Sequence, residues 1–507
     1  MIQFKIYLLI PLALLLSAKV LAQHRPKPSV IIIYSDDVGY GDISCYGAGK
    51  IQTPNIDKIA EEGIRFTNAH ASSSTCTPSR YALLTGKYPW RKKGTGIAAG
   101  DTGSIIDETQ FTLGDLFQNA GYQTAVIGKW HLGLGGPTGP NWNDSIKPSP
   151  NDLGFNYSFI IPATPDRVPC VYVENHHVVN LDLKDPIEVS YQHPIGTDPI
   201  GTLHPELLKV KADLQHSGTI INGISRIGYM KGGHQAYWKD DQMSDEITNK
   251  ALQFISDNKQ KSFFLYFAIQ DVHVPRLPNG RFRGKSGMGA RGDALLELDE
   301  NTGKILHLLD SLHLSKNTLV IFSSDNGPVL NDGYQDSAKI LLNGHDPSGP
   351  YKGWKYSKFD AGTRVPMMIR WPGIIKKGEV SQALIGQIDF LASMAHLLHF
   401  KLPDNAAPDS KELFKVLSGK SKKGRKSIIE QGLPGLAILK GDWKFIPPSR
   451  GAAVLKDKDN LETGNSNVGQ LYNLKDDIGE TKNLASKYPN KAKELSDLLF
   501  QIQEEVK

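Results

Sequence analysis

The chain has very few cysteines: Cys45, Cys76 and Cys170 are the only three among its 507 residues. A number this small, and odd, excludes a fold held together by a disulfide framework. At most Cys45 and Cys170 could pair, which would leave Cys76 unpaired. An unpaired cysteine is therefore a candidate for chemistry.

The sequence also lacks a long apolar run after its N-terminus. Residues 1–22 have the three parts of a secretory signal peptide. Lys5 supplies positive charge, residues 6–16 form an apolar run, and Val20 and Ala22 occupy the minus-three and minus-one positions of a cleavage site. The apolar run is shorter than the roughly 18 residues that a membrane-spanning helix needs. We therefore expect an exported protein, periplasmic or secreted after cleavage, with no stable membrane anchor.

There is no large excess of charge of either sign. The net charge is +5, and the lysines and arginines are scattered, without a basic stripe interleaved with aromatic residues. This pattern excludes nucleic acid as an expected partner. With 39% hydrophobic and 22% charged residues, the composition is that of a soluble globular protein with ample core.

What the sequence does contain is an alternation of apolar strands and amphipathic helices. Such alternation predicts an α/β fold, a large, mixed, mostly parallel sheet sandwiched by helices. Residues 137–245 are rich in Pro, Asn and Gly and predict loops over one end of the sheet. The expected strands are Ser29–Ser35, 64–68, 124–127, 263–269 and 318–323, and the expected helices are 53–63, 78–85, 112–120, 247–258 and 294–309.

The pattern changes after residue 400. Shorter elements at 427–431, 436–447 and 469–474 precede a closing helix from Pro489. We expect residues 23–400 to form a catalytic domain and 401–507 a smaller α+β subdomain built on an antiparallel sheet.

Acidic and amide side chains follow two of the expected strands, Asp36 and Asp37 after one, Asp325 and Asn326 after another. Ligands of parallel sheets bind at the carboxyl ends of the strands. An all-oxygen set favours calcium or magnesium over zinc. Read alone, the acidic pair could equally serve as a turn or cap.

Cys76 opens the motif CTPSR at 76–80. Pro78 suits the first turn of a helix, which would place Cys76 just ahead of that helix. The positive end of the helix would stabilise an anionic nucleophile, and Arg80 would add a cation one turn away. An ordinary buried cysteine is the alternative.

Further candidate groups are basic. In GKWHLG at 128–133, Lys129 and His131 alternate, so an extended backbone would direct both into one pocket. A surface lysine beside a structural histidine is the alternative. His273 follows the expected strand 263–269, and Lys355 opens the segment 355–366.

Together these motifs resemble those of the type I, formylglycine-dependent sulfatases of the alkaline phosphatase superfamily, and among them the arylsulfatase A-like and galactosamine-6-sulfatase-like enzymes. The segment 76–80 matches the Cys-x-Pro-Ser-Arg signature, followed by Leu-x-x-Gly at 83–86. Segments 34–42, 128–133 and 323–328 agree in order and spacing, and the resemblance covers nearly the whole mature chain. At 360–362, Asp-Ala-Gly replaces the usual Glu-Gly-Gly, which puts the local packing in doubt. We expect the nearby Arg364 to be structural.

The resemblance implies that a maturation enzyme oxidises Cys76 to formylglycine, whose hydrate attacks sulfur. It implies that one calcium ion neutralises charge. Either His273 or Lys355 would protonate the leaving oxygen, and His131 would act as general base. Arg80, Lys129 and Lys355 would offset the charge of the sulfate. The implied calcium ligands are Asp36, Asp37, Cys76, Asp325 and Asn326.

The expected substrate is a sulfated carbohydrate. Asp166 and Arg167 lie between prolines in the loop-rich segment, and a carboxylate beside a guanidinium suits vicinal hydroxyls. A surface ion pair is the alternative. His216 is a further candidate for substrate binding, with a similar structural role as its alternative. Segments 162–169, 219–228 and 350–366 resemble exported sulfatases of host or algal glycans that act on 6-sulfated galactose or N-acetylgalactosamine, which implies an exo-acting 6-O-sulfatase. The competing hypotheses are a 4-O-sulfatase for the same sugars, a phosphonate or phosphodiester hydrolase, and a non-catalytic glycan-binding relative.

Overall fold

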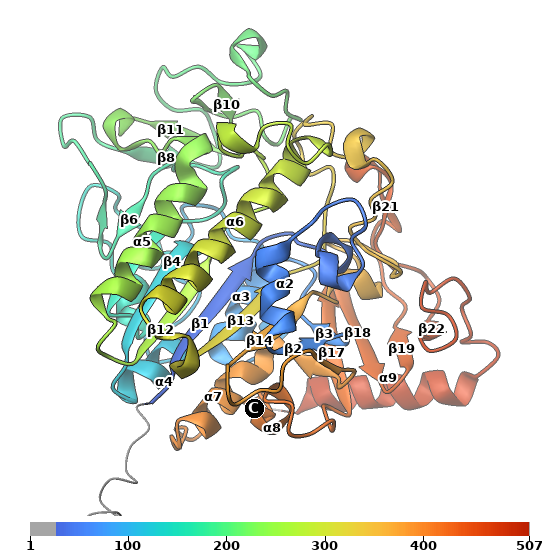
Figure 1. The fold of residues 1–507 in the computed structure, drawn as a ribbon. Coiled ribbons are helices and arrows are strands. Elements are labelled where there is room, and N and C mark those ends of the chain that lie inside the picture. The colour runs from blue at the N-terminus through green and yellow to red at the C-terminus, as the bar shows by residue number, and fades with distance from the viewer. Residues whose placement is uncertain (1–26, 506–507) are drawn as a thin grey trace, which may run out of the picture.

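The computed structural model describes residues 27–505 and contains one ten-stranded sheet (Figure 1). Its strand order is β15-β2-β14-β13-β1-β12-β4-β5-β6-β7. These strands are Glu379–Ser381, Ile64–Phe66, Met367–Arg370, Thr318–Ser324, Ser29–Ser35, Phe263–Ala268, Gln123–Lys129, Tyr157–Ile161, Val173–Glu174 and His177–Val178 in that order.

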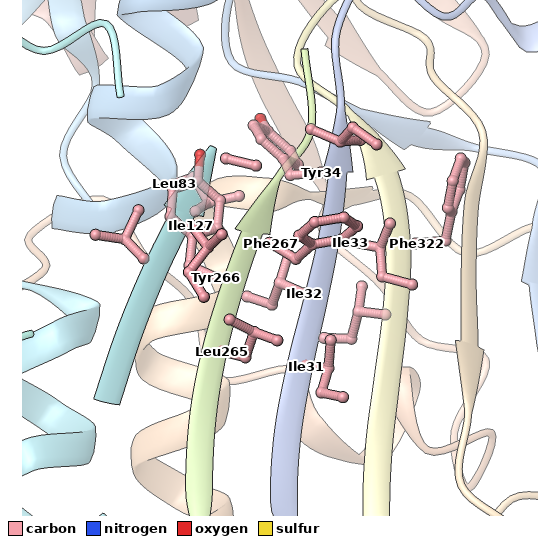
Figure 2. Close-up of a cluster of buried hydrophobic side chains, with 14 of the residues drawn as sticks. Ile31, Ile32, Ile33, Tyr34, Leu83, Ile127, Leu265, Tyr266, Phe267 and Phe322 are labelled. Carbon is pink, nitrogen blue, oxygen red and sulfur yellow. The ribbon is translucent and has the colours of Figure 1, made fainter. Parts of the chain in front are cut away.

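The five central strands, β13, β1, β12, β4 and β5, all pair in parallel. Every residue of β1 is buried, as expected for a strand covered on both faces. Figure 2 shows Ile31, Ile32 and Ile33 between the side chains of the two neighbouring strands. The outer strands β14, β6 and β7 run antiparallel to their neighbours, so the predicted mixed, mostly parallel sheet is confirmed.

Helices cover both faces of this sheet. Phe263 and Phe264 are consecutive in β12 and therefore point to opposite faces. Phe254 of α5 packs edge-on against Phe263, and Phe117 of α4 stacks on Phe264, so α5 and α4 lie on opposite sides. Figure 1 shows α5 and α6 side by side across one face, with α2 beside α6. The six main helices are α2 Pro54–Glu61, α3 Cys76–Thr85, α4 Leu113–Asn119, α5 Met243–Asp257, α6 Gly289–Ser311 and α7 Phe390–Leu397.

The C-terminal part forms a separate four-stranded antiparallel sheet, as predicted. The single element expected at 436–447 is wrong, because Gly441 adopts a left-handed φ of 59° and Lys440 pairs with Trp443 across a two-residue turn. The domain limits at 22 and 400 stay predictions. The sheet consists of β17 Ser427–Gly432, β18 Gly435–Lys440, β19 Trp443–Ile446 and β22 Gln470–Asn473, with the closing helix α9 at Pro489–Glu504.

The loop-rich segment 137–245 contains strands that the sequence pattern did not predict, and the longest of them is β5. β5 adds to the parallel sheet beside β4, and its five residues are too few to stand out among the surrounding prolines and glycines. The remaining strands of this segment are short, with two or three residues each. The other short elements are β3 Ala69–His70, β8 Glu188–Ser190, β9 Ile220–Ile221, β10 Ile224–Ser225, β11 Tyr229–Lys231, β16 Ile385–Gly386, α8 Phe414–Leu417, β20 Val454–Leu455 and β21 Leu461–Glu462.

All three cysteines lie within the described residues and are free, so Cys45 and Cys170 do not pair. Among residues 27–505, no helix combines the length and the apolar character needed to cross a bilayer. The predicted signal peptide, residues 1–22, lies outside the described residues.

Candidate active site

The carboxyl ends of two adjacent strands bring four polar side chains together. β1 and β13 are parallel neighbours, so Asp36 and Asp37 come to lie beside Asp325 and Asn326. Asn326 Nδ2 donates to Asp37 Oδ1 at 2.7 Å, and the backbone nitrogen of Asp37 lies 3.4 Å from Asp325 Oδ1. All four side chains are fully buried.

Three cations balance the three carboxylates of this cluster. Lys129 Nζ forms a short contact with Asp36, and Lys355 Nζ lies 2.9 Å from Asp37 Oδ2. Arg80 places Nε and Nη2 at 2.9 and 2.8 Å from Asp325 Oδ2. Buried charges of opposite sign thus alternate around the strand ends, as they must where water is excluded.

The cluster also retains oxygen atoms suited to a metal ion. Among the described residues, Asp36 Oδ1 and Asn326 Oδ1 are buried without a hydrogen-bond partner. One ligand atom each from Asp36, Asp37 and His273 lie within 4.8 Å of one another. Buried, unsatisfied carboxylate and amide oxygens are the donors that a hard cation such as calcium prefers, so these residues fit such an ion.

Cys76 is the first residue of α3, and not the residue ahead of it as the position of Pro78 suggested. The difference is one residue, within the usual uncertainty of a helix boundary. The side chain is 1% exposed. Burial raises the pKa of the thiol, and Lys129 and Lys355 offset only part of that effect. The unmodified thiol is therefore neutral near pH 7 and a weak nucleophile.

His131 reaches the site by a different backbone path from the one expected. β4 ends at Lys129, and His131 has a left-handed φ of 56°, so the extended alternation assumed for the pair is wrong. Burial, followed by the nearby charge of Lys129, nonetheless holds the pKa of His131 well below its usual value. Nε2 lies 3.0 Å from the Ala98 carbonyl and must donate to it. Within the described chain Nδ1 has no partner, so it is free to accept a proton.

His273 lies beside Asp36 and Asp37 of the acidic cluster. Its Nδ1 is 2.7 Å from the carbonyl oxygen of Val274 and donates there, which leaves Nε2 as an acceptor 3.9 Å from Asp37 Oδ2. Burial, followed by Lys355, lowers the pKa of His273. His273 is thus a neutral ring whose lone pair faces the cluster.

Asp166, Arg167 and His216 form one cluster beside this centre. Arg167 Nη1 lies 2.9 Å from Asp166 Oδ1, and His216 Nε2 lies 3.3 Å from Asp166 Oδ2. Asp166 is 2% exposed, which excludes the alternative of a surface ion pair. Burial alone would lower the pKa of His216, but hydrogen bonds to Asp166 and Asp213 raise it to about 9. The cluster follows β5, the neighbour of β4, and Asp166 lies near His273.

The segment 360–364 is part of a second buried charge network, between the two sheets. Asp360 forms a short ion pair with Arg364, and Ala361 is fully buried, so the residues that depart from the family pattern pack tightly. His70, Asp360 and Glu430 present ligand atoms within 4.8 Å of one another. Lys444 Nζ, however, lies 2.7 Å from Glu430 and supplies the positive charge there. Lys444 and Arg364 thus pair with the carboxylates of this network, which lies next to the segment that carries Lys355.

Two residues of the centre, Asp332 and Lys458, were not predicted from the sequence. Asp332 accepts hydrogen bonds from Lys355 and Tyr356, and Lys458 of the C-terminal part pairs with it. Neither residue belongs to a motif, and only the chain fold brings them to the strand ends. The sequence carries no signal that could have found Lys458.

A family model described as Sulfatase matches residues 28–400. The chain belongs to the sulfatase family. This sulfatase is 52% identical over 481 residues to an N-acetylgalactosamine-6-O-sulfatase of Bacteroides thetaiotaomicron, covering 95% of this chain and 94% of the relative. It is 30% identical over 509 residues to arylsulfatase A of Homo sapiens, covering 97% and 90%. A solved Bacteroides thetaiotaomicron structure, described with the metabolism of multiple glycosaminoglycans, superimposes with a TM-score of 0.93 at 53% identity, covering 94% of this chain and 99% of that one.

Proposed function

We propose that this sulfatase removes 6-O-sulfate esters from terminal galactose or N-acetylgalactosamine residues of glycans. The convergence of three carboxylates, three cations and a free histidine nitrogen around Cys76 carries this proposal, because it suits an anionic ester and a nucleophile. The similarity to an N-acetylgalactosamine-6-O-sulfatase supports the choice of sugar and sulfate position. The Asp166–Arg167 pair would bind vicinal hydroxyls of the sugar, one residue accepting and the other donating.

Formylglycine at position 76 and one calcium ion complete the proposed centre. When present, the hydrated aldehyde supplies the nucleophile and the cation neutralises negative charge. Asp36, Asp37, Asp325 and Asn326 would hold the ion, with residue 76 as a further ligand. The raised pKa of the buried Cys76 thiol supports conversion, because the unmodified side chain would be a poor nucleophile.

The remaining side chains would handle charge and protons. Arg80, Lys129 and Lys355 would offset the charge of the bound sulfate before attack. His131 is held neutral with Nδ1 free, so it would accept a proton as general base. Of the two candidates for protonating the leaving oxygen, we favour Lys355, because His273 already donates its Nδ1 hydrogen to Val274.

Export and maturation are further parts of the proposal. Residues 1–22 would direct the chain out of the cytoplasm and then be removed. Cys76 would be converted by a separate formylglycine-generating enzyme, so a production host must contain one.

The test has two steps. Mass spectrometry of the peptide that contains Cys76 should show the aldehyde in a competent host. The matured protein should then release sulfate from galactose or N-acetylgalactosamine sulfated at position 6, and more slowly from the 3- and 4-sulfates. Preference for the 4-sulfate, or for an aryl phosphate diester, would support the corresponding competitor. A chain that binds sulfated sugars without any turnover would be a non-catalytic relative.

A further inference from the structure

Asp332 is a buried carboxylate of the active centre that the mechanism above does not use. Its Oδ2 lies 2.9 Å from Lys355 Nζ, and the Tyr356 hydroxyl lies 2.9 and 3.0 Å from its two oxygens. Its Oδ1 lies 2.5 Å from Lys458 Nζ. Asp332 therefore stands between two ammonium groups and a phenol, and is 4% exposed.

Lys458 comes from a distant part of the chain. It ends a short 3-10 turn, Lys456–Lys458, between strands β20 and β21. This hairpin lies beyond residue 400, where the match to the sulfatase family model ends. The side chain is 12% exposed and reaches inward to Asp332, with its ammonium 5.3 Å from the centre of the Tyr356 ring.

The carboxylate of Asp332 is one of two negative charges that hold the ammonium of Lys355. Lys355 has two carboxylate partners, Asp37 and Asp332, each at 2.9 Å. Asp37 belongs to the group of oxygens that suits a metal ion, whereas Asp332 does not. Asp332 is therefore the carboxylate that stays available to hold Lys355 in place when Asp37 has another partner.

Two cations in turn hold Asp332 ionised. Burial alone would raise the pKa of Asp332, but Lys355 and then Lys458 bring it well below its usual value. Without Lys458, Asp332 would have one cation fewer and one unsatisfied lone pair in a buried position, which costs free energy and invites rearrangement.

We propose that Asp332 and Lys458 are positioning residues for Lys355, so that the β20–β21 hairpin completes the catalytic centre from outside the family-defining region. The inference deepens the proposed function and rests on it. Asp332 fixes the ammonium of Lys355 where it meets the sulfate ester, and Lys458 fixes Asp332.

The experiment compares kcat and KM on 6-sulfated N-acetylgalactosamine for matured variants of equal metal content. Asp332→Asn should lower kcat about 10- to 100-fold with little change in KM, because a misplaced catalytic group affects mainly the transition state. Lys458→Met should lower kcat about 5- to 10-fold, and Lys458→Arg should restore most of it. Lys456→Met, in the same turn but exposed, should match wild type.

A double-mutant cycle separates positioning from a general structural role. If Asp332 acts through Lys355, adding Asp332→Asn to Lys355→Ala should lower single-turnover rates no further, whereas independent effects would multiply. If Lys355→Ala is too slow to measure, the difference between Lys458→Met and Lys458→Arg decides. Multiplying effects, or a Lys458→Met protein with wild-type kcat, would overturn the inference. The wild-type protein is assayed first. If it releases no sulfate, the proposed function is wrong, and this result is distinct from a failure of the inference about Asp332 and Lys458.

Discussion

Arg80 directs two nitrogens at a single oxygen of Asp325, with Nε at 2.9 Å and Nη2 at 2.8 Å from Oδ2. This leaves the other carboxylate oxygen, Oδ1, facing the backbone nitrogen of Asp37 at 3.4 Å. The guanidinium therefore does more than supply charge, because it selects which oxygen of Asp325 is free.

The first prediction follows from that geometry. Arg80→Lys keeps the charge but has a single nitrogen, which cannot both donate to Asp325 Oδ2 as Nε does and reach the Lys129 carbonyl, to which Nη1 donates at 3.1 Å. We expect kcat/KM to fall about 100-fold, and Arg80→Ala to lower the free energy of unfolding by roughly 3–5 kcal/mol, as for a broken buried ion pair. Steady-state kinetics and urea unfolding measure the two effects. The exposed Arg283→Lys is the control and should behave as wild type.

Cys76→Ala should abolish sulfate release and leave the fold intact. The side chain removed is small, and its proposed role is chemical. A sensitive sulfate assay and a thermal melt of the same preparation measure both quantities. Turnover above about a hundredth of wild type would contradict the proposed nucleophile, since binding and charge alone rarely sustain that much.

Removal of calcium should stop turnover and lower the melting temperature. Asp36, Asp37 and Asp325 lie close together, and like charges repel when a cation between them is lost. A ligand at 100 times its dissociation constant stabilises the folded state by about 2.7 kcal/mol, which is easily resolved by calorimetry. Restoring the metal-free protein with calcium and, separately, with magnesium identifies the ion. Full activity with an unchanged melt after verified metal removal would exclude this site.

Asp166→Ala and Arg167→Ala should each reduce kcat/KM on the preferred sugar about 100-fold, the cost of one good charged hydrogen-bonding contact. The measurement uses galactose and N-acetylgalactosamine sulfated singly at position 3, 4 or 6. The exposed pair Lys231 and Glu188 offers a control, and Glu188→Ala should change nothing. Variants equal to wild type on every sugar would remove these residues from recognition.

His216 should make stability depend on pH between about 6.5 and 9. Its pKa is near 6.5 in an unfolded chain and about 9 in the folded protein, so the folded state binds more protons in that range. The stabilisation is complete below pH 6.5 and is lost as the pH rises through 9. A folded pKa raised this far corresponds to about 3 kcal/mol. Urea unfolding at pH 6.5 and 9 should show the decline in wild type and a much smaller one in His216→Gln.

The parts of the fold that depend on local hydrophobic pattern were predicted well from the sequence. β1 and β13 are continuous apolar runs, and parallel pairing then brings Asp36 and Asp325 together without further information. The same reasoning missed β5, whose five residues carry too weak a pattern, and joined β18 to β19 because the turn at Gly441 is short.

The local sequence pattern does not predict the position of a side chain that depends on an unusual backbone conformation or on contact with a distant segment. His131 enters the centre through a left-handed turn that alternation could not foresee. Lys458 meets Asp332 across 126 positions of sequence, a pairing set by the docking of the C-terminal sheet. Charge and residue type identify neither Asp332 nor Lys458 as part of the centre.

The parallel arrangement of the central sheet also has a consequence for synthesis. β1 ends at Ser35, and the first of its neighbours to be made, β12, begins at Phe263. At about 5–20 residues per second, those roughly 230 residues take about 12 to 46 s to make. For that time β1, whose residues are all buried in the folded protein, has no partner on either edge and can pair with strands of other chains. The backbone hydrogen bonds of β1 therefore cannot be completed within the sheet until the second half of the chain has been made.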